Sequence, residues 1–106
     1  MIRKAFVMSV NPDQHKEYER RHDVLWPELT QVFHDHGVFK FSIFLHRETN
    51  QLFAYAELES EEQWRAIAQT PTCKKWWAYM RDIMPSHPDN SPISIPLHEV
   101  YNMAGK

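Results

Sequence analysis

Two apolar strands in the middle of the chain place the strongest limit on the folds that this sequence can adopt. Residues 38–46 carry an apolar side chain at every second position: Phe39, Phe41, Ile43 and Leu45. Residues 52–59 do the same with Leu52, Ala54, Ala56 and Leu58, and a short polar stretch separates the two runs. This alternation predicts a β-hairpin with one apolar face, which other elements of the chain must cover.

The segment before the hairpin predicts a strand and then a broken helix. Residues 2–10 are apolar on both parities, as in a strand with two partly covered faces. Asn11 can cap a helix over 12–23 that has proline at its first position. Trp26-Pro27 interrupts this helix because proline has no N–H to donate, and a second helical piece over 27–36 follows.

Capping residues mark the other helix boundaries. Gly37 can end the second helical piece in a left-handed conformation. Ser60-Glu61-Glu62-Gln63 has the capping-box pattern, which predicts a helix over 60–69. After a break at a proline, Thr72 can cap a further helix over 72–84.

The predicted order of elements is β-α-β-β-α-β. A proline-rich loop over 86–96 and a last strand over 97–103 complete it. This order is typical of the ferredoxin-like α+β fold, here a single domain over residues 1–106 with its helices on one face of the sheet. Because the strands are apolar on both parities, we expect a homodimer in which a second copy covers the other face.

The composition excludes several classes of protein. The formal net charge of −2 at pH 7 favours neither nucleic acid nor an anionic membrane surface as a partner. No apolar run approaches the roughly 20 residues that span a bilayer, and the N-terminus lacks the pattern of a signal peptide. The single cysteine, Cys73, fits the reducing cytoplasm, and two glycines are too few for a phosphate-binding loop.

Tyr18 and His22 are four residues apart, so on a helix they share one face. His22 stands where the apolar stripe of the first helix would carry leucine, which points it inward. Such a histidine can be a core-edge residue bonded to the backbone, or an acid–base group facing a pocket. Imidazole suits proton transfer because its ordinary pKa is near 6.5.

Trp76 and Trp77 are adjacent on the predicted last helix. They belong to an apolar stripe that can simply be core. Two neighbouring indoles can also line one corner of a cavity, stacking on the C–H surface of a sugar and donating N–H groups to its hydroxyls.

Seven histidines raise the possibility of a metal site, but they are scattered along the chain. There is no HExxH motif and no second cysteine, so we expect no metal. Glu57 lies in the middle of a strand, where we expect it to pair with Lys4 or Arg3.

The chain resembles the L-rhamnose mutarotase family from end to end. The segments that carry the resemblance are 1–8, 10–13, 18–22, 26–29, 59–62, 76–80 and 84–92. They include the motifs Asn-Pro-Asp, Arg-Arg-His, Trp-Pro-Glu-Leu, Trp-Trp and Pro-Asp-Asn-Ser-Pro.

This resemblance implies a dimeric α/β barrel that interconverts the α and β anomers of L-rhamnopyranose in rhamnose metabolism. It also implies that His22 is the proton donor and that Tyr18, Trp76 and Trp77 contact the sugar. The family commonly has a tyrosine at the position of Phe41, so here the ring can form an apolar wall but supplies no hydroxyl.

Mutarotation needs a proton delivered to the ring oxygen and one removed from the anomeric hydroxyl. We expect protonated His22 to serve the ring oxygen, with no metal, nucleotide or redox cofactor. Glu57, Asp89 and a bound water are candidates for the second proton transfer. Two other functions stay open: a cofactor-independent or haem-degrading monooxygenase on the same fold, and a non-catalytic dimeric binding module.

Overall fold

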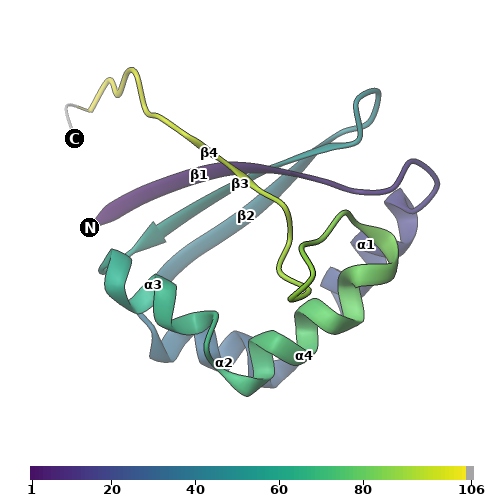
Figure 1. The fold of residues 1–106 in the computed structure, drawn as a ribbon. Coiled ribbons are helices and arrows are strands. Elements are labelled where there is room, and N and C mark those ends of the chain that lie inside the picture. The colour runs from purple at the N-terminus through teal and green to yellow at the C-terminus, as the bar shows by residue number, and fades with distance from the viewer. Residues whose placement is uncertain (105–106) are drawn as a thin grey trace.

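The computed structural model describes residues 1–104, which form a four-stranded sheet covered on one face by helices (Figure 1). In chain order the elements are β1 (Ile2–Ser9), α1 (His15–Asp23), α2 (Pro27–Asp35), β2 (Val38–His46), β3 (Gln51–Leu58), α3 (Glu61–Ile67), α4 (Pro71–Met80), the 3-10 helix η1 (Arg81–Ile83) and β4 (Ile95–Leu97). Within residues 1–104 no helix has the length and apolar character needed to cross a membrane.

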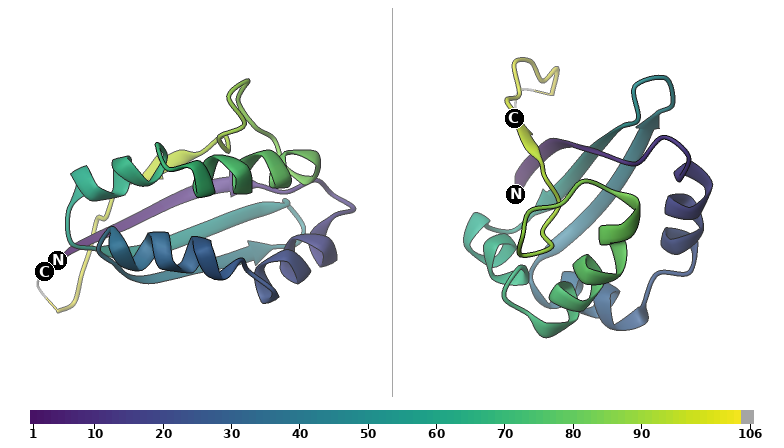
Figure 2. Two further views of the ribbon diagram at one scale, coloured as in Figure 1. Left: turned by 90° about the horizontal axis from the view of Figure 1, so that it is seen from below. Right: turned by 45° about the vertical axis from the view of Figure 1, so that its right-hand side comes forward.

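The strand order is β2-β3-β1-β4, and every neighbouring pair is antiparallel. This order confirms the predicted ferredoxin-like α+β class. Figure 2 shows α1 and α2 in one row and α3 and α4 in a second row beside it, both under the same face of the sheet. The site described below lies between these rows and the sheet.

The helix-facing side of the sheet is its apolar side, as the alternation predicts. Leu52, Ala54, Ala56 and Leu58 on β3 are each at most 2% exposed. Partner residues on both neighbouring strands face the same way and pack into the core: Phe6, Met8, Phe41, Ile43 and Leu45. The opposite side, which we call the outer face, also carries apolar side chains: Ala5, Val7, Phe44, Phe53, Ile95 and Leu97.

Phe39 departs from the predicted alternation. A β-bulge lies between Val38 and Lys40, so two residues of β2 stand opposite one residue of β3. The extra residue changes the register, and Phe39 is 62% exposed. The expectation that it shares the buried face with Phe41 was therefore wrong.

The helix caps are partly as predicted. Ser60 is the N-cap of α3: the Gln63 backbone N–H donates to its hydroxyl oxygen over 3.1 Å. The cap of α4 is Thr70 and not Thr72, because Pro71 occupies the first helical position, and the Cys73 N–H donates to Thr70 Oγ1 over 3.2 Å.

The start of α1 also differs from the prediction. The Gln14 N–H donates to the Asn11 carbonyl over 3.0 Å, so residues 11–14 form a turn that has Pro12 at its favoured second position. The helix begins only at His15, and Asn11 is not its cap. The predicted break at Trp26-Pro27 is confirmed, since α1 ends at Asp23 and α2 starts at Pro27.

The C-terminal elements are shorter than the sequence predicts. The last helix ends at Met80 and continues as η1, and the strand expected over 97–103 is instead β4 at Ile95–Leu97. Pro96 lies inside this edge strand and has no N–H for a partner, so the pairing with β1 is brief. The other predicted boundaries agree with the structure within two residues.

Candidate active site

Helix α1 brings Tyr18 and His22 together, as their spacing predicts. The two rings stack with centroids 4.4 Å apart and planes 28° from parallel. Tyr18 is buried and His22 is half-buried. A phenol and an imidazole thus share one face of the helix.

The backbone fixes which nitrogen of His22 carries hydrogen. Nδ1 lies 2.9 Å from the Tyr18 carbonyl oxygen, and a carbonyl can only accept a hydrogen bond, so Nδ1 is the protonated nitrogen of the neutral ring. Nε2 makes no hydrogen bond to any residue among 1–104. In the neutral imidazole its lone pair is free to accept a proton.

Burial lowers the pKa of His22 below its ordinary value of 6.5, although the Tyr18 carbonyl and the Asp23 carboxylate oppose this shift. Neutral imidazole is therefore the resting form at pH 7.

The tryptophan pair reaches the same place from α4. Trp76 is buried, and its indole lies perpendicular to the His22 ring, with centroids 5.4 Å apart and planes 88° apart. Trp77, next along the helix, is half-buried and packs against both groups of core residues. Trp26 completes the cluster from the other side, 5.1 Å from Trp76 between ring centroids.

Three polar groups of this cluster have no hydrogen-bond partner within residues 1–104: the Tyr18 hydroxyl and the indole N–H groups of Trp76 and Trp77. Over the same residues, no side-chain nitrogen or oxygen is both sealed from solvent and unpaired. The three groups are therefore reachable from outside and can bond a ligand hydroxyl.

A cleft of about 1180 Å³ lies between the inner face of the sheet and the helices. Its lining includes the four residues singled out from the sequence: Tyr18, His22, Trp76 and Trp77. The sheet supplies an apolar floor that includes Phe41, whose ring packs at 5.4 Å from that of Phe33. Aromatic walls with a few convergent polar groups are typical of sites for small molecules.

The other two candidates for proton transfer lie elsewhere. Glu57 is on the outer face, where it accepts a hydrogen bond from Tyr55 at 2.8 Å. The expected ion pair of Glu57 was wrong, because Arg3 bonds Glu99 and Lys4 bonds Glu61.

Asp89 also stands apart from the cleft, in the exposed loop after η1, where its carboxylate accepts the Ser91 backbone N–H. Polar residues that the sequence reasoning did not select also line the cleft, among them His15 and Glu19 on α1. Their spacing from Tyr18 and His22 on one helix face is the signal that could have found them. Among residues 1–104, no three histidine, cysteine, aspartate or glutamate side chains gather as metal ligands do.

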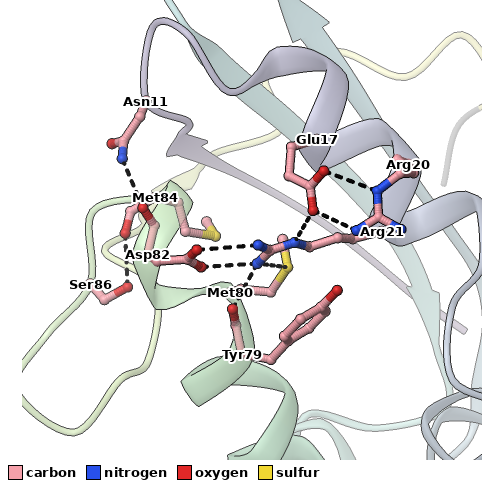
Figure 3. A network of polar contacts seen from close by, with 9 residues as sticks. All are labelled: Asn11, Glu17, Arg20, Arg21, Tyr79, Met80, Asp82, Met84 and Ser86. Atoms are coloured by element: carbon pink, nitrogen blue, oxygen red, sulfur yellow. Dashed lines mark hydrogen bonds and ion pairs between the residues drawn. The ribbon is translucent and has the colours of Figure 1, made fainter.

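Next to His22 lies the one charged side chain that is buried among the described residues, Arg21. Its guanidinium donates to Glu17 at 2.7 Å, to the Tyr79 carbonyl at 2.7 Å and to both carboxylate oxygens of Asp82 at 3.0 and 3.2 Å (Figure 3). It also lies 4.2 Å from the centre of the Tyr79 ring. Arg21 therefore links α1 to the end of α4 and to η1.

Comparison with known proteins identifies relatives that match nearly the whole chain. The family model for L-rhamnose mutarotase matches residues 3–103. The L-rhamnose mutarotase of Tolumonas auensis is 61% identical over 104 residues, which are 98% of this chain and 100% of the relative.

Solved structures add two likenesses. L-rhamnose mutarotase FA22100 from Formosa agariphila superposes with a TM-score of 0.89 at 48% identity, covering 97% of this chain and 99% of that one. A putative antibiotic biosynthesis monooxygenase from Nitrosomonas europaea reaches a TM-score of 0.64 at 14% identity, over 93% of this chain and 89% of that one. The second likeness is one of fold alone.

Proposed function

The chain belongs to the L-rhamnose mutarotase family, and we propose that His22 carries out the family reaction in this chain. The reaction interconverts the α and β anomers of L-rhamnopyranose, so the protein is an isomerase that acts on a carbohydrate. The observation that supports the role of His22 is its unbonded Nε2 in a neutral, half-buried ring at the wall of the cleft.

One nitrogen can serve both proton transfers, because the anomeric oxygen and the ring oxygen are bonded to the same carbon. Nε2 takes the proton of the anomeric hydroxyl, C1 and the anomeric oxygen form a carbonyl, and the electron pair of the bond from C1 to the ring oxygen moves onto that oxygen. The imidazolium then donates the proton to the ring oxygen, which gives the open-chain aldehyde. Rotation about the C1–C2 bond and the reverse steps close the ring as the other anomer.

In this scheme the donor role of His22 follows its uptake of a proton, which agrees with the lowered pKa of the resting ring. The Nδ1–H bond to the Tyr18 carbonyl holds the tautomer and the ring orientation through the cycle. The scheme requires no second proton-transfer group, and the two carboxylates considered for that task, Glu57 and Asp89, do not line the cleft.

The aromatic residues supply the binding surface. We propose that Trp76 and Trp77 stack on the C–H edge of the sugar, including the methyl group of a 6-deoxy sugar, and that their N–H groups and the Tyr18 hydroxyl bond its hydroxyls. Phe41 then contacts the sugar from the floor of the cleft as an apolar wall that supplies no hydroxyl.

NMR saturation transfer between the anomeric protons tests the proposal, with L-rhamnose, L-fucose and D-glucose measured with and without protein. We expect exchange to be accelerated for L-rhamnose, and lost in His22→Ala but not in His46→Ala, whose side chain is exposed at the far end of β2. Acceleration for L-fucose alone would keep the reaction type but show that L-fucose, and not L-rhamnose, is the substrate. A folded protein that accelerates exchange of none of the three sugars would refute the proposed function.

We propose further that the protein works as a homodimer through its outer face. Three apolar side chains of that face are strongly exposed in the single chain: Phe44 at 64%, Ile95 at 63% and Leu97 at 45%. Packing this face against a second copy removes them from water. Light scattering should give the mass of a dimer for the wild type and of a monomer for Phe44→Glu; a monomeric wild type would contradict the proposal.

We propose that the protein works in the cytoplasm. We also propose that residues 1–106 act as one domain. Cys73 is a buried free thiol of the kind that a reducing compartment maintains. Fractionation of cells that produce the native protein should recover it with cytoplasmic markers, and recovery with periplasmic markers would contradict this.

A further inference from the structure

We infer that Arg21 is a positioning residue, which holds the tryptophan-bearing helix α4 against α1 so that Trp76 keeps its T-shaped contact with the His22 ring. The inference rests on the proposed role of His22 in proton transfer. The observation behind it is the place of Arg21 in the network of Figure 3, between the two helices that carry the site, α1 and α4.

The junction between α1 and α4 depends on side chains, because the backbones of the two helices approach each other at few points. Arg21 fills that gap with a rigid fork. Its two terminal nitrogens bind both oxygens of Asp82 in η1, and one of them also binds the Tyr79 carbonyl in the last turn of α4. A bidentate arginine–carboxylate pair fixes orientation as well as distance.

From this fork, a continuous series of ring contacts leads to the catalytic histidine. The guanidinium lies over the Tyr79 ring, and that ring stacks on Trp26 with centroids 5.6 Å apart. Trp26 meets Trp76 at 5.1 Å, and Trp76 meets His22 at 5.4 Å. Loosening the fork therefore frees the whole series of rings that forms one wall of the cleft.

Burial distinguishes the hydrogen bonds of Arg21 from those of its neighbour Arg20. Its side chain is 9% exposed, whereas the side chain of the neighbouring Arg20 is 58% exposed and is bound to Glu17 alone among the carboxylates of this network. Lysine cannot replace the fork, since it offers one point charge in place of a planar bidentate group. Arg20 is thus a control with the same charge and a shared partner; it also lies near the Tyr79 side chain, and lysine keeps its positive charge there.

The experiment compares Arg21→Lys, Asp82→Asn and the control Arg20→Lys in the full chain. The first measurement is the chemical shift of the His22 Cε1 proton at pH 8, which reports the ring currents of Trp76 and Tyr18 and needs no substrate. The second is kcat and KM for anomer exchange of L-rhamnose. The third is the thermal unfolding midpoint, which separates folded variants from unfolded ones.

We expect Arg21→Lys and Asp82→Asn to move the His22 resonance and to lower kcat/KM by about tenfold or more, because a small misplacement of catalytic groups has a large effect on rate. Arg20→Lys should keep the wild-type resonance and remain within about twofold of the wild-type kcat/KM. If Arg21→Lys does not fold, Asp82→Asn decides, since its side chain is 68% exposed and its replacement leaves the interior filled.

An unchanged His22 resonance with kcat/KM within about twofold of wild type in folded Asp82→Asn would overturn the inference, and so would an equal loss in Arg20→Lys. A wild type without exchange activity refutes the proposed function instead. In that case the resonance comparison still decides whether Arg21 positions the ring.

Discussion

The pH dependence of the reaction follows from the state of His22 and can be worked out in sign and shape. In the proposed mechanism the neutral ring is the active form, because Nε2 must first accept the anomeric proton. Burial holds the pKa of His22 below 6.5, so kcat/KM should be flat between about pH 7 and 8. Below the pKa the neutral fraction falls tenfold for each pH unit, and kcat/KM should fall with it.

The assay is anomer exchange of L-rhamnose by NMR from pH 4.5 to 8, after subtraction of the rate without protein at each pH. Circular dichroism at each pH shows whether the chain stays folded. This control is needed because the unfolded His22, whose pKa is higher, binds a proton more readily and the fold loses stability as pH falls below 6.5. A rate that rises as the pH falls from 7 to 5.5, or a half-maximal point above pH 6.5, would refute the assignment of a neutral base.

Three other changes have definite expected outcomes. Gly37→Ala should lower the free energy of unfolding by at least about 1 kcal/mol in a denaturant titration, because Gly37 has φ +72° and an added Cβ would lie 2.8 Å from that of Glu59; an unchanged midpoint would contradict this. Phe41→Tyr should lower KM for L-rhamnose by about two- to tenfold through one added hydrogen bond; a KM equal to or above that of wild type would show that the floor of the cleft does not meet a sugar hydroxyl. Burial raises the pKa of Cys73 to about 12, so a thiol reagent at pH 8 should label it only after denaturation; rapid labelling of the folded protein would contradict its burial.

Local patterns in the sequence predict the features of this fold that depend on neighbouring residues. The alternation of β3, the cap at Ser60 and the shared face of Tyr18 and His22 each follow from the spacing of a few residues, and the structure confirms all three. The exact start of α4 was missed because two threonines flank one proline, and the preference of Pro71 for the first helical position favours Thr70 as the cap.

Features that depend on distant residues could not be predicted in the same way. The bulge that exposes Phe39 arises from pairing with β3 and leaves no mark in the alternation of β2. Arg21 belongs to a strongly charged stretch, and its burial depends on Asp82, which is 61 positions away in the chain. The spacing of Tyr18 and His22 was enough to place His22 on a helix face. The protonation state of its ring depends on burial, which only the structure shows.

The ratio of anomer exchange rates in wild type and His22→Ala, measured on L-rhamnose at pH 7.5, is the decisive measurement. Loss of a positioned acid–base group should reduce the protein-catalysed rate by about 10² to 10⁴-fold in a variant that remains folded. A folded His22→Ala protein that exchanges the anomers at the wild-type rate would show that another group moves the protons.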